Sequence, residues 1–562
     1  MKYIFFFFAL VFTSTNWAQN QVPTDYFSDP LDVPIILSGS FGELRSNHFH
    51  SGLDIKTQQR EGLPVFAPAD GYVKRIKVAH YGYGKALYIQ HPNGYTTVYA
   101  HLQRYAHDIE DYVKEKQYQK ETYEFEDFPE KTYLPVKKGE IIAYTGNSGS
   151  SGGPHLHYEI RDPGSRPMNP LLFGVEVPDT KTPLVNALLA YPIGDSAHIN
   201  NDANRSKLRL IRQNDGSYRS EKVVAHGKIG FGVSVNDQFN GASNKNGAYR
   251  IKATYNGTEK FEVLFEKFSF AETRYLNRHI DYEYYQTDNN RVQKLFREAN
   301  NPLSVITKED DSGFITVEDG YDGDYVIEVT DYKGNTLRIV IPIEGKSNPS
   351  PTPKNNKETD HYVYSKQGTS ISKGKFNIYI PANSLYENVY LEVEDKGDTL
   401  YFHEDVVPIH RNISISVDAS NYTEEDLSKL FIARLSSRGT PYYNTTTRKG
   451  SKLSTRTRTF GTYTIVSDTT PPRVRPINFS DGKWISNNKT LKIGIDDDLS
   501  GISSYRATVN GKFILMEYNY KTDVLTYDFD DDIIKDTENN LKLIVVDNVG
   551  NSTTFEATFF RK

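Results

Sequence analysis

The 562-residue sequence contains no cysteine. This absence excludes disulfides, thiolate metal ligands and a lipid carried on an N-terminal cysteine, so each domain must be held together by its own hydrophobic core. Any zinc site would have to be built from His, Asp and Glu. Such ligand sets are commoner in catalytic sites, where three protein ligands leave one position for water.

The sequence also lacks a strong excess of charge, since the formal net charge is only -6. A surface that attracts polyanions is therefore not expected, and nucleic acid is an improbable partner. Hydrophobic residues make up 37% and charged residues 25% of the chain, which is an ordinary globular balance. At ~150 residues per domain, the length predicts about four domains.

Only one long apolar run is present, and it lies at the N-terminus. Lys2 is followed by an apolar stretch from Ile4 to Phe12, and Ala18 is a plausible last residue before cleavage. This pattern predicts a signal peptide at 1–18, with an uncleaved anchor as the alternative. No other segment approaches the ~20 apolar residues that a transmembrane helix needs. We therefore expect an exported protein of the periplasm or cell envelope, or a secreted one.

Short alternating apolar runs separated by Gly, Asn and Asp turns predict a mainly β protein. The first part of the chain should be an open antiparallel β-sheet domain, followed by about three Ig-like or other β-sandwich modules. The boundaries are marked by SNPSPTPKNNKE at 347–358 and by the paired prolines after Asp468. The predicted units are a β-sheet domain at 24–178, a β-sandwich module at 180–346, a linker at 347–358, a β-rich module at 359–467 and an Ig-like β-sandwich module at 468–562.

Histidines are concentrated in the predicted first domain, where eight of the 14 lie between positions 48 and 157. The segment His50-Ser-Gly-Leu-Asp54 places an imidazole and a carboxylate four residues apart, with a glycine between them. Both ligand types suit zinc. A polar turn that happens to hold histidines is the alternative for this segment alone.

Two further histidine segments are expected on strands. In His155-Leu-His157, alternation places both histidines on one face, so that one could bind a metal while the other faces the same cavity. In Thr97-Val-Tyr99-Ala-His101-Leu102, alternation places Tyr99 and His101 together at the end of a strand that follows the Asn93-Gly94 turn. Histidines that merely satisfy strand packing are the alternative in both cases.

Taken together, these segments resemble the lysostaphin-like (LytM-type) zinc endopeptidases. The resemblance covers roughly residues 38–172 and rests on motifs in the family's order: His50-Ser-Gly-Leu-Asp54, Tyr99-Ala-His101-Leu102 and Gly153-Pro-His155-Leu-His157-Tyr-Glu159. It implies an open, mainly antiparallel sheet with a groove over the metal. It also implies a zinc-dependent endopeptidase that cuts peptide bonds in the stem peptides or cross-links of peptidoglycan.

The resemblance further implies roles for individual residues. His50, Asp54 and His157 would bind Zn²⁺, with water in the fourth position. His155 would orient or deprotonate the water and His101 would donate to the developing oxyanion, although these two roles could be exchanged. Arg45 and Tyr99 are candidates for substrate binding, and a structural ion pair is the alternative for Arg45.

Two features depart from the family pattern. Gly152 stands where the family usually has threonine, and about 33 residues at 103–135 form an insert rich in Glu, Lys, Tyr and Asp. We also keep a different class of function open, namely a non-enzymatic wall-binding scaffold or activator of other wall hydrolases. Because no comparable histidine cluster occurs after position 180, residues 24–178 are expected to suffice for catalysis, with protein partners possible through the later modules.

Overall fold

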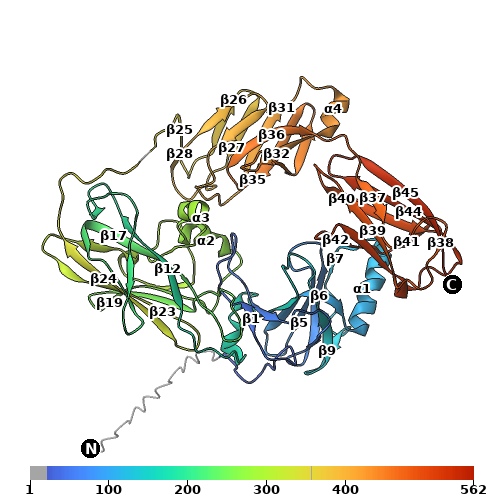
Figure 1. Cartoon of the computed structure of the whole chain (residues 1–562), viewed down its shortest axis with the longest axis horizontal. Helices are drawn as coiled ribbons and strands as arrows, with labels where there is room; N and C mark the ends of the chain where they lie inside the picture. The colour runs from blue at the N-terminus through green and yellow to red at the C-terminus, as the bar shows by residue number, and fades with distance from the viewer. Residues whose placement is uncertain (1–21, 356) are drawn as a thin grey trace, which may run out of the picture.

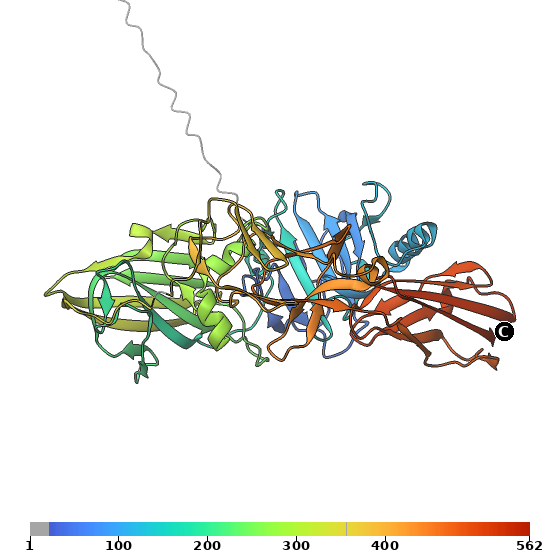
Figure 2. The ribbon, with the colours of Figure 1, turned by 90° about the horizontal axis from the view of Figure 1, so that it is seen from above.

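A computed structural model describes residues 22–355 and 357–562, so the predicted signal peptide at 1–18 lies outside the described residues. The chain folds into four β-rich parts, here called the first (22–178), second (180–346), third (359–467) and fourth (468–562) domains. Figure 1 shows that they follow one another around a ring, so that the fourth domain returns to the first. Seen from above, the second and fourth domains lie at opposite ends of an elongated molecule (Figure 2). Within the described residues, we find no helix with the length and apolar character to cross a membrane.

The first domain is one antiparallel sheet in the order β1-β2-β10-β6-β5-β4-β7, with β11, β3, β9 and β8 attached to it. Its strands are β1 (Leu37–Gly39), β2 (Leu53–Lys56), β3 (Pro64–Phe66), β4 (Gly71–Val78), β5 (Lys85–Gln90), β6 (Thr96–Tyr105), β7 (Phe125–Asp127), β8 (Pro135–Val136), β9 (Ile141–Thr145), β10 (His155–Arg161) and β11 (Pro167–Met168). The open antiparallel sheet expected from the sequence is confirmed. The 3₁₀ turn η1 (Pro170–Phe173) closes the domain.

The insert at 103–135 contains the helix α1 (His107–Lys120) followed by β7. Acidic residues in its first turn and a lysine in its last turn complement the helix dipole. Ile109, Val113 and Gln117 are buried, whereas the exposed residues are His107, Asp108, Asp111, Glu115, Gln119 and Lys120. The charged insert is therefore a helix that projects from the sheet.

The second domain contains one 13-stranded sheet in which the long strand β17 links two halves. Its strands are β12 (Leu184–Pro192), β13 (His198–Ile199), β14 (Ser206–Lys207), β15 (Leu210–Arg212), β16 (Tyr218–Ser220), β17 (Val223–Asn236), β18 (Arg250–Tyr255), β19 (Thr258–Leu264), β20 (Gln293–Lys294), β21 (Ile306–Glu309), β22 (Ile315–Val317), β23 (Asp322–Thr330) and β24 (Thr336–Gly345). Its helical turns are η2 (Thr273–Tyr275), α2 (Leu276–His279), α3 (Tyr282–Asp288) and η3 (Asp311–Gly313).

One hydrophobic core runs through the first and second domains. Phe49 contacts Phe265 and Phe268, with ring centroids 5.6 and 5.4 Å apart, and Phe41 packs on Phe268 at 5.1 Å. Aromatic side chains bury large apolar areas and contribute strongly to core stability. The two domains are thus joined by packing and not only by the chain.

The third domain follows the segment 347–358, in whose described residues no helix or multi-residue strand occurs. Two five-stranded sheets, β26-β27-β31-β35-β34 and β29-β30-β36-β32-β33, share one core, which is the arrangement of a β-sandwich. Its elements are β25 (His361–Val363), β26 (Thr369–Lys373), β27 (Phe376–Ile380), β28 (Val389–Leu391), β29 (Val393–Asp395), β30 (Thr399–Phe402), β31 (Ile413–Asp418), α4 (Glu424–Lys429), β32 (Leu430–Leu435), β33 (Pro441–Tyr443), β34 (Thr446–Lys449), β35 (Lys452–Thr457) and β36 (Gly461–Ser467).

The fourth domain is a second sandwich, in which sheets β37-β39-β43-β42 and β38-β45-β44-β40-β41 enclose one core. Its elements are β37 (Arg473–Pro476), β38 (Lys483–Trp484), β39 (Thr490–Asp496), β40 (Ile502–Val509), β41 (Lys512–Ile514), β42 (Glu517–Asn519), β43 (Val524–Asp528), η4 (Phe529–Asp531), β44 (Glu538–Asp547) and β45 (Ser552–Phe560). Alternation of apolar residues along strands such as β44 places one face toward this core.

The fourth domain contacts the first domain through the helical insert. Lys114 of α1 forms an ion pair with Asp531, and the Tyr118 hydroxyl donates to the same carboxylate at 2.6 Å. At the start of β5, Lys85 Nζ lies 2.9 Å from Glu517 Oε2. The fourth domain therefore packs against helix α1 of the insert.

Candidate metal centre and active site

Strand pairing in the first domain brings the candidate ligands together across the sheet. β2 and β10 run antiparallel, and their register places Asp54 directly opposite His157. Gly52 permits this close approach, since a Cβ atom there would lie 2.3 Å from the Tyr158 carbonyl oxygen. Two residues 103 positions apart in the chain thus become cross-strand neighbours.

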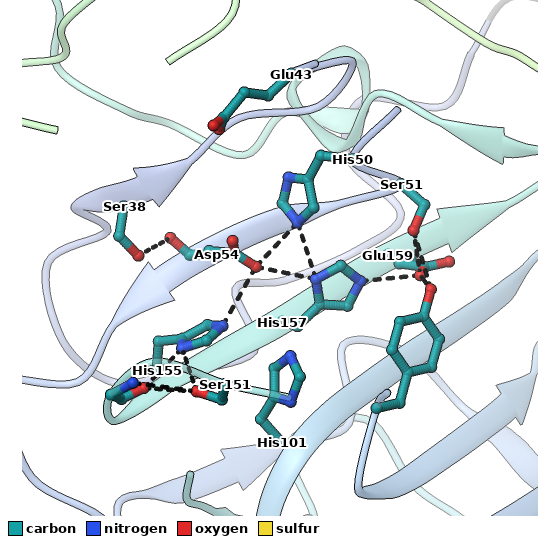
Figure 3. A network of polar contacts seen from close by, with 12 residues as sticks. Ser38, Glu43, His50, Ser51, Asp54, His101, Ser151, His155, His157 and Glu159 are labelled. Carbon is teal, nitrogen blue, oxygen red and sulfur yellow. Dashed lines mark hydrogen bonds and ion pairs between the residues drawn. The ribbon is translucent and has the colours of Figure 1, made fainter. Parts of the chain in front are cut away.

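His50 lies just before β2, and its imidazole completes a cluster with Asp54 and His157 (Figure 3). His50 Nε2 is 3.0 Å from Asp54 Oδ1 and 3.0 Å from His157 Nδ1, and the latter two atoms are 2.9 Å apart. All three side chains are buried. Three potential metal ligands from two segments therefore converge on one point.

In His50 and His157, the ring nitrogen that faces away from the cluster donates a hydrogen bond. This bond determines which nitrogen presents its lone pair to the cluster. His50 Nδ1 donates to the Ser40 carbonyl oxygen at 2.7 Å, and His157 Nε2 donates to Glu159 Oε1 at 2.9 Å. In the neutral imidazoles, His50 Nε2 and His157 Nδ1 are then unprotonated. Carbonyl and carboxylate partners of this kind orient metal-binding histidines.

Glu159 is a buried carboxylate that accepts hydrogen bonds from several side chains. It belongs to the sequence motif, but the sequence analysis assigned it no role. Its Oε1 accepts from Ser51 Oγ at 2.7 Å and from the Tyr83 hydroxyl, and its Oε2 accepts from Arg161 Nε at 2.6 Å. Burial would raise the pKa of Glu159, but the Arg161 charge and the hydrogen bond from His157 hold it well below its usual range. Tyr83, which stands between two glycines, gave no signal in the sequence.

Electrostatics favour a cation at the cluster. Burial would raise the pKa of Asp54, but the nearby imidazoles lower it, so its carboxylate is charged. Burial would lower the pKa of His157, but its bonds to Asp54 and Glu159 raise it to about 9. Without a metal, the cluster therefore holds a proton between nitrogen and oxygen lone pairs.

The donor set fits zinc. Zinc takes imidazole nitrogen and carboxylate oxygen at about 2.0–2.2 Å, which puts tetrahedral ligands roughly 3.3–3.6 Å apart. The observed separations of 2.9–3.0 Å need only a small opening. Arg45 Nη2 lies 3.0 Å from Asp54 Oδ2, the oxygen that does not face the histidines. One oxygen of Asp54 is thus left for the metal.

The two candidate catalytic histidines lie beside this cluster. His155 Nε2 is 3.4 Å from Asp54 Oδ1, and its Nδ1 donates to the Gly153 carbonyl oxygen at 2.9 Å. His101 Nδ1 donates to the Ser148 carbonyl oxygen at 2.9 Å, and the His101 ring centroid is 4.8 Å from that of His155. In its neutral form, each ring therefore carries its proton on Nδ1 and offers Nε2 as an acceptor.

The backbone at His101 differs from the expected regular strand. His101 has φ +60°, a left-handed conformation that is uncommon outside glycine and typically costs about 1–3 kcal/mol. This twist breaks the alternation. Tyr99 points into the core with no exposed surface and donates to Thr97 Oγ1, whereas the His101 ring lies beside His155 and His157.

This geometry corrects the expectation for Tyr99. Tyr99 and His101 do not share a face, and a fully buried Tyr99 packed on Tyr158 does not reach a substrate. Arg45 forms ion pairs with Asp54 and Glu43, the arrangement kept as the alternative, and its role in substrate binding stays a prediction. His107, by contrast, begins α1 with 87% of its side chain exposed and pairs with Asp111.

Comparison with known protein families gives matches in the first and third domains. Residues 48–118 and 127–170 match the model of Peptidase family M23, and the gap between the two segments falls within the insert. Residues 360–468 match the model of the Zu5-like domain. The first domain is therefore a metallopeptidase domain of the M23 (LytM) type.

Two of the curated relatives are each similar to part of this chain. An uncharacterized metalloprotease of Haemophilus influenzae is 38% identical over 138 residues, covering 25% of this chain and 23% of that protein. The DD-carboxypeptidase/endopeptidase Mpg of Neisseria meningitidis is 35% identical over 136 residues, covering 24% and 25%. This chain thus spans about a quarter of the length of each. A solved structure of a zinc-containing peptidase from Vibrio cholerae is 26% identical, covering 27% of this chain and 41% of that one, with a TM-score of 0.20.

Proposed function

We propose that this protein is an exported, zinc-dependent endopeptidase that hydrolyses peptide bonds in peptidoglycan. The observation that carries the proposal is the convergence of His50 Nε2, Asp54 Oδ1 and His157 Nδ1, with both lone-pair-bearing nitrogens set by outer hydrogen bonds. The relatives named DD-carboxypeptidase/endopeptidase and metalloprotease support the substrate class and the metal.

His50, Asp54 and His157 would hold the zinc ion. When bound, zinc lowers the pKa of a water molecule toward ~7 and polarises the scissile carbonyl. The protein supplies two bases close by, because His155 and His101 each offer an unprotonated Nε2. Burial lowers the pKa of His101 to about 3, so this ring is neutral before reaction.

A neutral His101 accepts a proton at Nε2 before it can donate one. We therefore propose that either His155 or His101 removes a proton from the attacking water, and that the ring so charged donates to the oxyanion or the leaving amine. This refines the expectation that His101 acts first as a donor. His155, nearer Asp54, remains our choice for the base.

The test is the reaction itself. Purified full-length protein should contain about one zinc per chain and release peptides from peptidoglycan that mass spectrometry can assign to a bond. A chelator should abolish release and added zinc should restore it. His155→Ala should keep zinc and lose hydrolysis. Stoichiometric zinc without any released peptide would favour the alternative of a wall-binding scaffold or activator.

A further inference from the structure

His101 depends on two loops for its orientation. Its backbone N–H donates to the Tyr83 carbonyl oxygen at 2.9 Å, and its Nδ1 donates to the Ser148 carbonyl oxygen at 2.9 Å. A left-handed φ at a non-glycine residue persists only where the surroundings enforce it. The turn 79–84 and the loop 146–153 provide those surroundings.

These two loops are tied to each other. Gly82 N donates to Ser150 Oγ at 3.0 Å, and Ser150 N donates to the Gly82 carbonyl oxygen at 2.8 Å. Gly84 and Gly149 approach so closely that a Cβ on either would lie within 2.5 Å of the other's backbone nitrogen. The two loops therefore behave as one unit around His101.

The fourth domain contacts both loops with one hairpin, formed by β42, the turn 520–523 and β43 and here called the terminal hairpin. The Tyr520 ring lies 4.5 Å from that of Tyr81, and its hydroxyl donates to the Gly149 carbonyl oxygen at 3.3 Å. Lys521 Nζ donates to the Asn147 carbonyl oxygen at 2.6 Å and to its Oδ1 at 3.2 Å. Asn147 immediately precedes Ser148.

We propose that Tyr520 and Lys521 are positioning residues for His101. They hold the loop pair from outside, one residue away from the carbonyl that binds the imidazole. The catalytic geometry would then depend on the docked fourth domain, although none of its residues belongs to the metal cluster. The kinetic consequence of this proposal rests on the proposed peptidase function.

The remaining contacts allow the hairpin to be tested alone. The domain is also held by the pairs Lys114–Asp531 and Lys85–Glu517 and by Leu515, which joins the core of the first domain. Removing the two hairpin side chains should therefore leave the domain docked. Any effect can then be assigned to the loops and not to loss of the domain.

The experiment compares full-length wild type with the double variant Tyr520→Ala/Lys521→Ala, with Lys483→Ala, an exposed lysine on β38 of the same domain, as control. In the double variant we expect faster hydrogen exchange in peptides covering 79–84 and 146–153. We also expect weakening of the protected Nδ1–H resonance of His101, identified by its loss in His101→Ala. Zinc per chain should not change.

On peptidoglycan peptides, kcat of the double variant should fall by about 10- to 10²-fold with little change in KM, the scale of a small misplacement of a catalytic group. Lys521→Arg in the otherwise native chain should keep most of the activity. Unchanged loop exchange and an unchanged His101 resonance would overturn the proposal, as would full kcat in the double variant. If wild type hydrolyses nothing, the proposed function fails, while exchange and the resonance still decide whether the hairpin positions His101.

Discussion

Two clusters of potential metal ligands in this molecule are equally compact but differ in composition, since one combines two imidazoles with a carboxylate and the other contains three carboxylates. One cluster is formed by His50, Asp54 and His157 in the first domain. The other is formed by Asp237 and Asp331 of the second domain with Asp179, which directly precedes it, and each cluster places three ligand atoms within 4.8 Å of one another. In the first cluster the single carboxylate is matched by two imidazoles and by Arg45. In the second, three carboxylates face one another, and burial followed by the Asp179 charge raises the pKa of Asp237 to about 7.

The difference indicates which features suit a compact cluster to a transition metal. In the histidine cluster, Ser40 and Glu159 take up the outer nitrogens and so aim the lone pairs inward. In the acidic cluster, Asp331 instead accepts from Asn335, and Asp179 from the Lys181 backbone, which are the bonds of ordinary turns. Proximity of acidic groups is common, whereas preset lone pairs are what a transition metal needs.

The largest expected effect is on metal content. His157→Ala should lose stoichiometric zinc, because it removes one of three ligands and frees Glu159 from its partner. Asp237→Asn, a change in the acidic cluster, should leave zinc at wild-type level. Elemental analysis of dialysed full-length proteins makes the comparison, and full zinc in the His157 variant would refute the ligand assignment.

The next effect concerns two similar histidines, His101 and His107. His101→Ala should lower kcat by ~10²-fold or more, the scale of losing one group that stabilises the transition state. His107→Ala should change kcat little, since its ring is exposed on α1 and pairs only with nearby acidic residues. Steady-state kinetics on zinc-loaded variants decide this. A large loss for His107 and none for His101 would reverse the assignment.

A smaller effect is expected at Arg45, whose bond to Asp54 Oδ2 orients the carboxylate. Arg45→Ala should weaken zinc affinity by about 10- to 10²-fold, as is typical when a partner of a metal ligand is removed. Arg60→Ala, on the loop after β2, serves as control. Competition with a zinc-binding dye measures both, and equal affinities would assign Arg45 a purely structural role.

A last effect, on stability and not on zinc or catalysis, is a pH dependence of opposite sign at Asp237 and Asp54 in the metal-free protein. Asp237 has a raised folded pKa, so its contribution to stability is complete below pH 3.8 and is lost as pH rises through about 7. Asp54 has a lowered pKa, so its contribution is present above 3.8 and is lost on acidification below that value.

Native-state hydrogen exchange can separate these contributions. Peptides covering β17 should lose protection between pH 4 and 7 with a slope of at most about 1.4 kcal/mol per pH unit. Asp237→Asn should flatten this slope, because an amide cannot ionise. An unchanged slope in the variant would show that another group is responsible.

Much of the site was predictable because its signals are local. Spacing indicated His50-Asp54 and His155-His157 as candidate metal-binding segments, and alternation predicted that His155 and His157 share a face. The assignment of His50, Asp54 and His157 as the ligands came from the family resemblance. The strands expected around Thr97–Leu102 and His155–His157 correspond to β6 and β10. The expectation that Tyr99 and His101 share a face was wrong, because alternation assumes a regular strand and the left-handed backbone conformation at His101 interrupts it.

The relation between domains was not predictable from local patterns. The sequence suggested that 24–178 would suffice for catalysis, yet Phe41 and Phe49 in that segment are covered by Phe265 and Phe268 of the second domain. The sequence of the charged insert did not indicate that helix α1 would contact the fourth domain. Such contacts join residues hundreds of positions apart, and periodicity carries no information about them.

The sequence by itself determined the kinds of ligand available, the mainly β architecture and the identity of the histidine and aspartate groups, because composition and spacing act within a few residues. Only the tertiary structure decided that Asp54 lies opposite His157, that Glu159 and Ser40 preset their partners' lone pairs, and that the terminal hairpin reaches the loops around His101. These features arise from strand register and domain packing, where each contact depends on the whole chain having already been brought together.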